Sequence, residues 1–284
     1  VEIANLPRAA FPIGAVPDAT AARMQTQRCV QAWRGALQSD PALRDTLMAR
    51  ARVPDRYGTW QRAAGLYPLL RWPFFAGVQA WQRRHEATMS QWAAAPPPLQ
   101  RFVPAGVAAS NAVPWPGRPR DALGVPRFSP EEVAVLLAAH APALEIETHG
   151  NADRFGALTW RGGALPAVDT AGPPQAYQRI AYTRYGGHVL VQLVYGLWFP
   201  ERPPLGRFDL LAGALDAVVL RITLAPDDGR PLLVDAIHGC GCYHLFIPRV
   251  ALAPRPGAPA DVEWAFPPTT LPALRRGERI VVRL

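Results

Sequence analysis

The sequence contains no lysine, so arginine supplies all 30 of its basic residues. This absence excludes a lysine Schiff base, the lysine of a nucleotide-binding P-loop and a serine–lysine dyad within the chain. Serine is also rare, and none of its positions lies in the Gly-x-Ser-x-Gly elbow of a serine hydrolase. No Gly-x-Gly-x-x-Gly motif opens a helix after a strand, so we do not expect a nucleotide cofactor.

Long apolar runs are absent as well. The longest, Val189 to Phe199, is interrupted by Gln192 and predicts a strand, because a membrane helix needs about 18 or more apolar residues. We therefore expect no transmembrane segment. The sequence begins at Val1 with a stretch that does not resemble a signal sequence, and it ends on the strand-like run Ile280–Leu284. We expect a processed start and further sequence beyond this end.

The charge balance is basic but dispersed. The net charge is +8, yet the arginines cluster only in pairs such as Arg83-Arg84 and Arg275-Arg276. Arginine and alanine richness without lysine indicates coding bias, so we do not expect nucleic-acid binding. A hydrophobic share of 49% and a charged share of 18% are typical of a globular protein.

Helix signals dominate the first part of the chain. Asp18 is a suitable N-cap for a helix that ends at about Leu37. Pro41 suits the first position of a second helix, which we expect to end near Arg52. From Ala93 to Arg127, repeated prolines predict a linker and loops.

The clearest local signal is Ser129-Pro130-Glu131-Glu132. A serine N-cap, proline at the first helical position and glutamate at the third form a capping box. The box predicts a helix that ends near His140, because Pro142 follows.

Aromatic side chains concentrate between Leu66 and Phe75. We expect Pro68 and Pro73 to break this segment into short pieces. A helix should then extend from Pro73 to Trp92. One interpretation is helix packing against the β-rich part. The other is a docking surface for protein subunits or a membrane surface. Its contact residues would be Tyr67, Trp72, Phe74 and Phe75.

After residue 144 the apolar period changes towards two. Ala176–Arg184 and His188–Phe199 predict an antiparallel pair joined by Gly186-Gly187. Ala217–Leu224 and Pro231–His238 predict two further strands. The sequence therefore predicts an α+β fold, with N-terminal helices packed on a mainly antiparallel C-terminal sheet. We divide it into a helical region, residues 1–141, and a β region, residues 142–284, as two parts or one continuous domain.

Two of the three cysteines lie beside two histidines in Ile237-His238-Gly239-Cys240-Gly241-Cys242-Tyr243-His244. On an ideal strand His238, Cys240, Cys242 and His244 share one face, and the first and last are about 20 Å apart. One metal can bind all four only if the chain bends, and the two glycines allow a bend.

The first interpretation of this motif is a transition-metal site. Thiolate and imidazole ligands suit zinc, copper or iron. Because one loop rarely completes a metal shell, His188, His149 and Glu147 are secondary candidates. We expect a metal-dependent enzyme, an oxidoreductase or a hydrolase, with the substrate unassigned.

Two alternatives remain open. Cys240 and Cys242 could cycle as a thiol-redox pair, or one of them could be a nucleophile with a histidine as base. Alternatively, Cys29 forms a disulfide with Cys240 or Cys242 in a non-catalytic structural or interaction module. The 32 prolines and the clustered thiols favour an extracytoplasmic location, periplasmic or secreted.

Overall fold

The computed structural model has a mixed α+β fold, with helices and mostly antiparallel sheets. It describes residues 19–50, 59–64, 67–91, 99–105, 113–161, 165–204, 206–207, 209, 212–239, 241, 243–249, 252, 266–272, 274 and 278–284. The chain forms two compact units, residues 1–56 with 121–123 and residues 57–120 with 124–284.

The described residues of the first unit form the helices α1 (Ala19–Ser39) and α2 (Pro41–Arg50). Both were predicted, and Asp40 caps α2 by accepting a hydrogen bond from the Leu43 backbone at 2.9 Å. The predicted N-cap Asp18 lies outside the described residues. Arg34 and Gln38 on α1 donate to the buried Asp121 carboxylate.

The second unit begins with α3 (Thr59–Ala64) and α4 (Tyr67–Gln91). The predicted break at Pro73 is wrong, because α4 continues through this residue. Proline at an interior position removes one backbone hydrogen bond and bends a helix without always ending it. Pro68 lies in the first turn, where its missing N–H would have no intrahelical partner. No described helix is long and apolar enough to cross a membrane.

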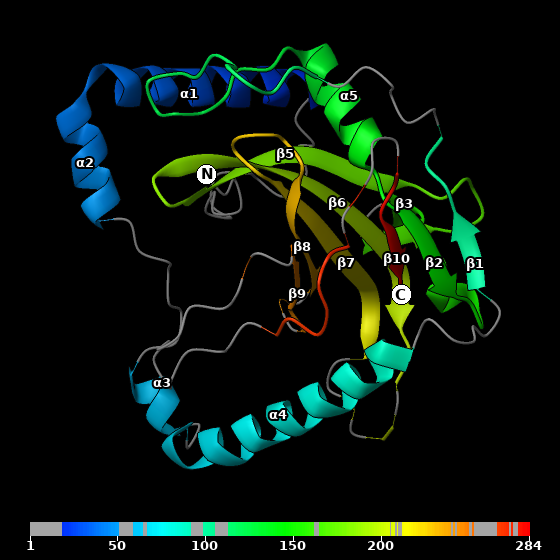
Figure 1. The fold of residues 1–284 in the computed structure, drawn as a ribbon. Helices are drawn as coiled ribbons and strands as arrows, with labels where there is room; N and C mark the ends of the chain where they lie inside the picture. The colour runs from blue at the N-terminus through cyan, green and yellow to red at the C-terminus, as the bar shows by residue number, and fades with distance from the viewer. Residues whose placement is uncertain are drawn as a thin grey trace. The chain divides into compact units, whose positions relative to one another are not determined.

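The main sheet has the strand order β5-β6-β7-β8-β9 and is antiparallel throughout (Figure 1). Its strands are β5 (Ala176–Tyr185), β6 (His188–Arg202), β7 (Gly213–Leu224), β8 (Pro231–His238) and β9 (Leu245–Pro248). The sequence predicts β5 to β8, although β7 begins four residues earlier than expected.

The described residues also form two smaller sheets. One contains β1 (Leu99–Phe102), β2 (Ala143–Glu147) and β10 (Val281–Arg283), with β10 parallel to β2. The other is the hairpin of β3 (Ala157–Arg161) and β4 (Leu165–Asp169), which follows the short 3-10 helix η3 (Asn151–Asp153). The predicted loop before Arg127 therefore contains a strand, β1.

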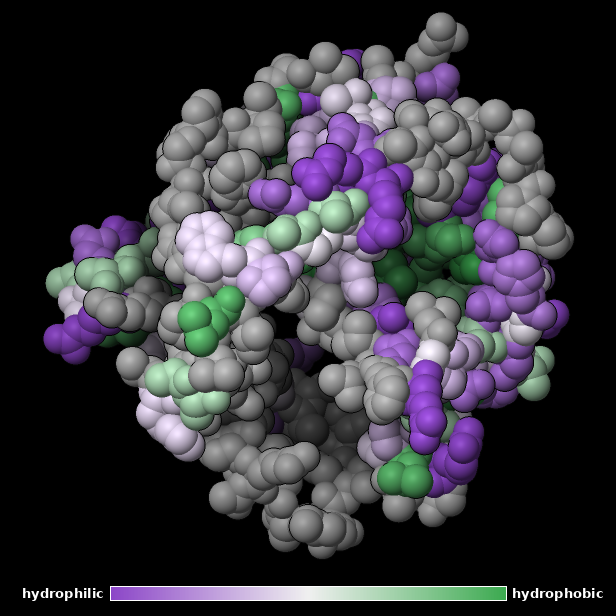
Figure 2. Space-filling view, turned by 90° about the horizontal axis from the view of Figure 1, so that it is seen from below, coloured by the Kyte–Doolittle hydropathy of each residue, from purple (hydrophilic) through white to green (hydrophobic). Residues whose placement is uncertain are grey.

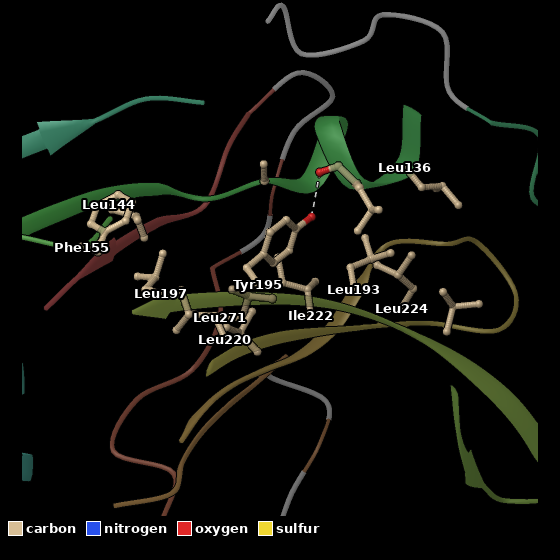
Figure 3. Packing of buried hydrophobic residues seen from close by; sticks show 14 of the residues in the cluster. Leu136, Leu144, Phe155, Leu193, Tyr195, Leu197, Leu220, Ile222, Leu224 and Leu271 are labelled. Carbon is tan, nitrogen blue, oxygen red and sulfur yellow. Dashed lines mark hydrogen bonds between the residues drawn. The ribbon is translucent and has the colours of Figure 1, made fainter. Parts of the chain in front are cut away.

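The core lies between one face of the main sheet and α5 (Pro130–His140). The predicted capping box is present: Ser129 and Glu132 exchange side-chain-to-backbone hydrogen bonds. Figure 3 shows Leu193, Leu197, Leu220 and Ile222 packed beneath the helix. The buried Tyr195 hydroxyl donates to the Leu137 carbonyl of α5 at 2.8 Å (Figure 3), and burial raises the pKa of this phenol.

Candidate functional site

A pocket with a volume of about 340 Å³ lies where β6, β7 and β8 approach their ends. It forms because large side chains on β6 face small ones on β7. In the sheet register Trp198 is opposite Ala217, and Arg202 is opposite Gly213. The lining residues are Trp198, Arg202, Ala212, Gly213, Ala214, Leu215, Asp216, Ala217, His238 and Gly239.

Leu215 interrupts the regular geometry of β7 at this pocket. Its φ angle is 64°, in the left-handed region, and it shares this property with only Tyr243 among the described non-glycine residues. Side chains of a regular strand alternate between faces, but Ala214, Leu215, Asp216 and Ala217 all line the pocket. A residue with positive φ breaks that alternation. Such backbone strain, about 1–3 kcal/mol, concentrates at functional sites.

His238 and Asp216 form a pair on the pocket wall. The Nε2 atom of His238 lies 2.9 Å from both carboxylate oxygens of Asp216. Each side chain is 20% exposed, so the pair is shielded but reachable by a ligand. The backbone N–H of Ala217 also donates to Asp216, at 2.7 Å, and holds the carboxylate in place. His238 was predicted from its motif, whereas Asp216 was not.

Gly239 fixes the end of β8 close to β7. Its backbone N–H donates to the Ala217 carbonyl at 2.6 Å. A Cβ atom on this residue would lie 2.8 Å from the Cβ of Ala217, closer than side chains pack. Glycine here therefore lets β8 continue along β7 far enough to bring His238 to Asp216.

A chain of rings connects His238 to helix α4. Tyr243, with φ 54°, packs edge-on against His238 with 6.2 Å between ring centroids. Trp81 of α4 contacts Tyr243 at 5.2 Å and Phe266 at 5.7 Å, and it stacks on His85 at 3.9 Å. These contacts hold the loop after β8 against the helix, which limits the positions open to His238.

His244 lies on the opposite face of the main sheet from His238. Its Nε2 atom is 2.9 Å from Oδ1 of the buried Asp235 and 3.1 Å from Nη2 of Arg221. In the register Asp235 pairs with Phe246 and His238 pairs with Val218, which places Asp235 and His238 on different faces. The structure thus gives each histidine its own carboxylate and does not bring the two together.

The secondary candidates also lie apart from His238. His149 bonds Glu147 at 2.7 Å at the end of β2, where both side chains are largely exposed. His188 opens β6, nine residues before Leu197, whose β7 partner Val218 pairs with His238. Nine residues of strand span about 30 Å, so His188 and His238 cannot share one ion.

The cysteine predictions lie largely outside the described residues. Cys240 and Cys242 are not described, and Cys29 is exposed on α1 in the first unit. The predicted disulfide and thiol-redox pair therefore stay predictions. Within the described part of the chain, no three His, Cys, Asp or Glu side chains are grouped closely enough to hold a metal ion.

Arg202 provides the positive charge of the pocket. Its guanidinium lies 4.0 Å from Asp209, at the outer limit of an ion pair. The sequence did not predict Trp198, Arg202 or Asp216, because these residues come to line one pocket with His238 only through the pairing of β6, β7 and β8.

Comparison of the chain with protein-family models, curated proteins and solved structures found no match. Function is therefore inferred from the side chains that the fold brings together.

Proposed function

We propose that the chain is a hydrolase in which His238 is the general base and acid. The observation that carries this proposal is the His238–Asp216 hydrogen bond on the wall of a ligand-sized pocket. A carboxylate on one imidazole nitrogen fixes the tautomer and orientation of the ring and stabilises its protonated form. With Nε2–H donated to Asp216, Nδ1 is the basic nitrogen.

The proposed step is hydrolysis of an ester or amide bound in the pocket. Nδ1 of His238 takes a proton from water, and the resulting hydroxide attacks the substrate carbonyl. The same proton then passes to the leaving oxygen or nitrogen as the carbon–heteroatom bond breaks. Asp216 stays ionised and stabilises the imidazolium between the two transfers.

The test uses mono-4-nitrophenyl succinate, an anionic chromogenic ester. His238→Ala should lower kcat/KM about 100-fold or more, the usual contribution of a positioned acid–base group. His188→Ala is the matched control, because it removes a histidine about 30 Å away along the sheet and should leave the rate unchanged. Equal rates in the two variants, or a wild-type rate no higher than that of free imidazole, would reject the proposal.

A second proposal for the same site is the metal-dependent enzyme predicted from the sequence. The observation that favours it is again the Asp216 contact, because histidines that bind metals usually hydrogen-bond a carboxylate through their other nitrogen. His238 would supply one ligand, and Cys240 and Cys242 would supply thiolates. A bound transition metal would activate water.

Metal analysis of protein purified without a nickel column tests this second proposal. Stoichiometric zinc, copper or iron that is lost in Cys240→Ala/Cys242→Ala, and retained in the control Cys29→Ala, would support it. Substoichiometric metal that is the same in all three proteins would reject it. Because His238→Ala should lower the ester rate under either proposal, the metal content decides between them.

A separate proposal concerns the exposed stripe of α4 as a docking surface for an anionic membrane surface. Leu69, Trp72 and Arg83 fall on one helical face and are all exposed, with Leu69 71% and Trp72 67% accessible. On the face drawn in Figure 2, hydrophobic residues of the described chain lie scattered among hydrophilic ones. Aromatic rings interleaved with arginine suit the headgroup region of a bilayer.

Vesicle co-sedimentation tests the docking proposal. Binding to phosphatidylserine-containing vesicles should fall with added salt and weaken about 10-fold in Leu69→Ser/Trp72→Ser. Trp160→Ser removes an equally exposed tryptophan from β3 and serves as the control. Absence of binding by the wild type, or equal loss in the control, would reject the assignment.

A further inference from the structure

We infer that the pocket beside His238 binds a small aromatic carboxylate, with the carboxylate on Arg202 and the ring against Trp198. This inference rests on the proposed function in that it names the substrate class of the same site. It stands on three properties of the pocket: its cation, its aromatic wall and its small residues.

The cation is the guanidinium of Arg202. The other charged groups that line the pocket, Asp216 and His238, are hydrogen-bonded to each other, whereas Arg202 approaches its acidic neighbour Asp209 only to 4.0 Å. A planar guanidinium binds a carboxylate through two parallel hydrogen bonds. A bound carboxylate would therefore make closer contacts with Arg202 than Asp209 does. The net charge of +8 also favours an anionic ligand.

The aromatic wall is Trp198, four residues before Arg202 on β6. Residues four apart on a strand lie on the same face, about 13 Å apart along the backbone. The long arginine side chain spans part of this distance, and the remaining length suits one six-membered ring. Stacking of a ligand ring on an indole supplies both apolar burial and geometric selection.

Small residues create the space that the ring would occupy. Ala217 lies opposite Trp198 and Gly213 lies opposite Arg202, so β7 presents small residues at both ends of the trough, and Leu215 lines the pocket between them. A Cβ atom on Gly213 would meet nothing within 4 Å. The volume of about 340 Å³ is at the lower end for ligand pockets and suits roughly ten to twenty non-hydrogen atoms.

His238 and Gly239 line the same pocket at the end of β8. In the register His238 follows Val218 and Leu197, whereas Trp198 and Arg202 have the other parity on β6, so a ligand held by these two residues would meet His238 only at the end of the strands.

Isothermal titration calorimetry with trans-cinnamate tests the inference. Cinnamate should bind with a dissociation constant on the order of 1 mM, typical of a ligand of this size. Cinnamamide, which lacks the charge, and 3-cyclohexylpropanoate, which lacks the ring, should each bind about 10-fold more weakly. The same weakening is expected in Arg202→Gln and in Trp198→Leu.

Three controls separate pocket binding from general effects. Arg179→Gln removes an exposed arginine of β5 and should keep the wild-type affinity. Trp198→Phe keeps an aromatic wall and should stay within about 3-fold of the wild type. Gly213→Val adds a side chain where space is open, so it should fold normally and block cinnamate.

The outcomes that overturn the inference are specific. No wild-type binding of cinnamate, equal binding of cinnamamide, or unchanged affinity in Arg202→Gln would each reject it. Phenyl phosphate binding 10-fold more tightly than cinnamate would assign the cation to phosphate instead. The hydrolase proposal is judged from the ester rate of His238→Ala, and this inference from the cinnamate affinity of Arg202→Gln and Trp198→Leu, so failure of one remains distinguishable from failure of the other.

Discussion

Asp235 on β8 and Arg221 on β7 stand directly opposite each other, and 2.6 Å separates Oδ1 from Nη2. The Asp235 side chain is 3% exposed, and His244 is its second partner at 2.9 Å. A buried carboxylate is tolerated here because two positive or polar groups converge on one of its oxygens. The cluster forms on the sheet face away from His238, which separates a structural histidine from the proposed catalytic one.

Asp235→Asn should therefore destabilise the fold by about 2–4 kcal/mol, because it leaves Arg221 and His244 without their acceptor charge. Urea unfolding followed by circular dichroism measures the change as a shift in midpoint at constant slope. Asp228→Asn is the control, since Asp228 is 40% exposed and its ion pairs are 3.8 and 3.9 Å long. It should stay within about 0.5 kcal/mol of the wild type. Equal effects in both variants would contradict the structural role of Asp235.

Local signals were sufficient for much of the fold. The capping box at Ser129 predicted α5, and the Gly186-Gly187 turn predicted the β5–β6 hairpin, because each depends on a few neighbouring residues. β1 was missed, since a four-residue strand with prolines nearby becomes recognisable only when it pairs with β2. The break predicted at Pro73 was wrong, because the loss of one backbone hydrogen bond did not end α4.

The candidate site was predictable only in part. His238 stood out through its motif, but its partner Asp216 is 22 residues away and lies before the predicted start of its strand. The alternation of side chains along a strand predicted that His238 and His244 lie on one face. It could not account for the reversal between β8 and β9, which puts His244 beside Asp235. Tertiary register decides both contacts, and no short sequence window contains it.

Arg118 should be a strong determinant of stability. Its guanidinium bonds both Glu132 oxygens, at 3.0 and 2.8 Å, and the carbonyls of Pro114 and Arg127, and it lies 4.4 Å from the centroid of the Phe128 ring. The hydrogen bonds from Arg118 lower the pKa of Glu132. Arg118→Lys keeps the charge but loses the planar fork, so we expect a loss of about 1–3 kcal/mol in chemical denaturation. Arg101→Lys, at an exposed 3.7 Å pair, should change stability by less than about 0.5 kcal/mol.

Tyr195→Phe should cost about 1–2 kcal/mol, because the buried Leu137 carbonyl would lose its hydroxyl donor while the ring packing stays. Thermal unfolding measures this loss. Tyr185→Phe removes a hydroxyl from an exposed residue at the β5–β6 turn and should leave the melting temperature unchanged. A Tyr195→Phe protein as stable as the wild type would show that the carbonyl finds another donor.

His140 should make the fold sensitive to acid. Burial lowers the pKa of this histidine, and its Nδ1 atom bonds the Leu136 carbonyl at 3.0 Å, which partly opposes the shift. A lowered folded-state pKa means that folding favours the neutral ring. The stabilisation is therefore present above the unfolded value of about 6.5 and is lost as pH falls through the folded pKa.

His140→Gln removes this titration and should flatten the decline of unfolding free energy between about pH 7 and pH 5. Denaturant midpoints measured across that range for both proteins provide the comparison. Parallel curves for the wild type and the variant would show that other groups account for the acid sensitivity.

Leu215 tests whether the pocket stores backbone strain. In an ordinary strand glycine is less stable than alanine by about 0.5–1 kcal/mol, because it loses more conformational freedom on folding. Because the φ angle of Leu215 is 64°, glycine should be more stable than alanine at this position. A Cβ atom in the left-handed region costs about 1–2 kcal/mol. Leu215→Gly should thus be more stable than Leu215→Ala by about 0.5–1 kcal/mol, although both lose the leucine side chain.

The matched comparison is at Val219, a residue of the same strand that lies within its regular register. There Val219→Gly should be less stable than Val219→Ala, in the usual order. Urea midpoints of the four variants give the two differences. The same order at both positions would mean that Leu215 is unstrained, and the strained β7 geometry would then no longer support placing a functional site beside His238.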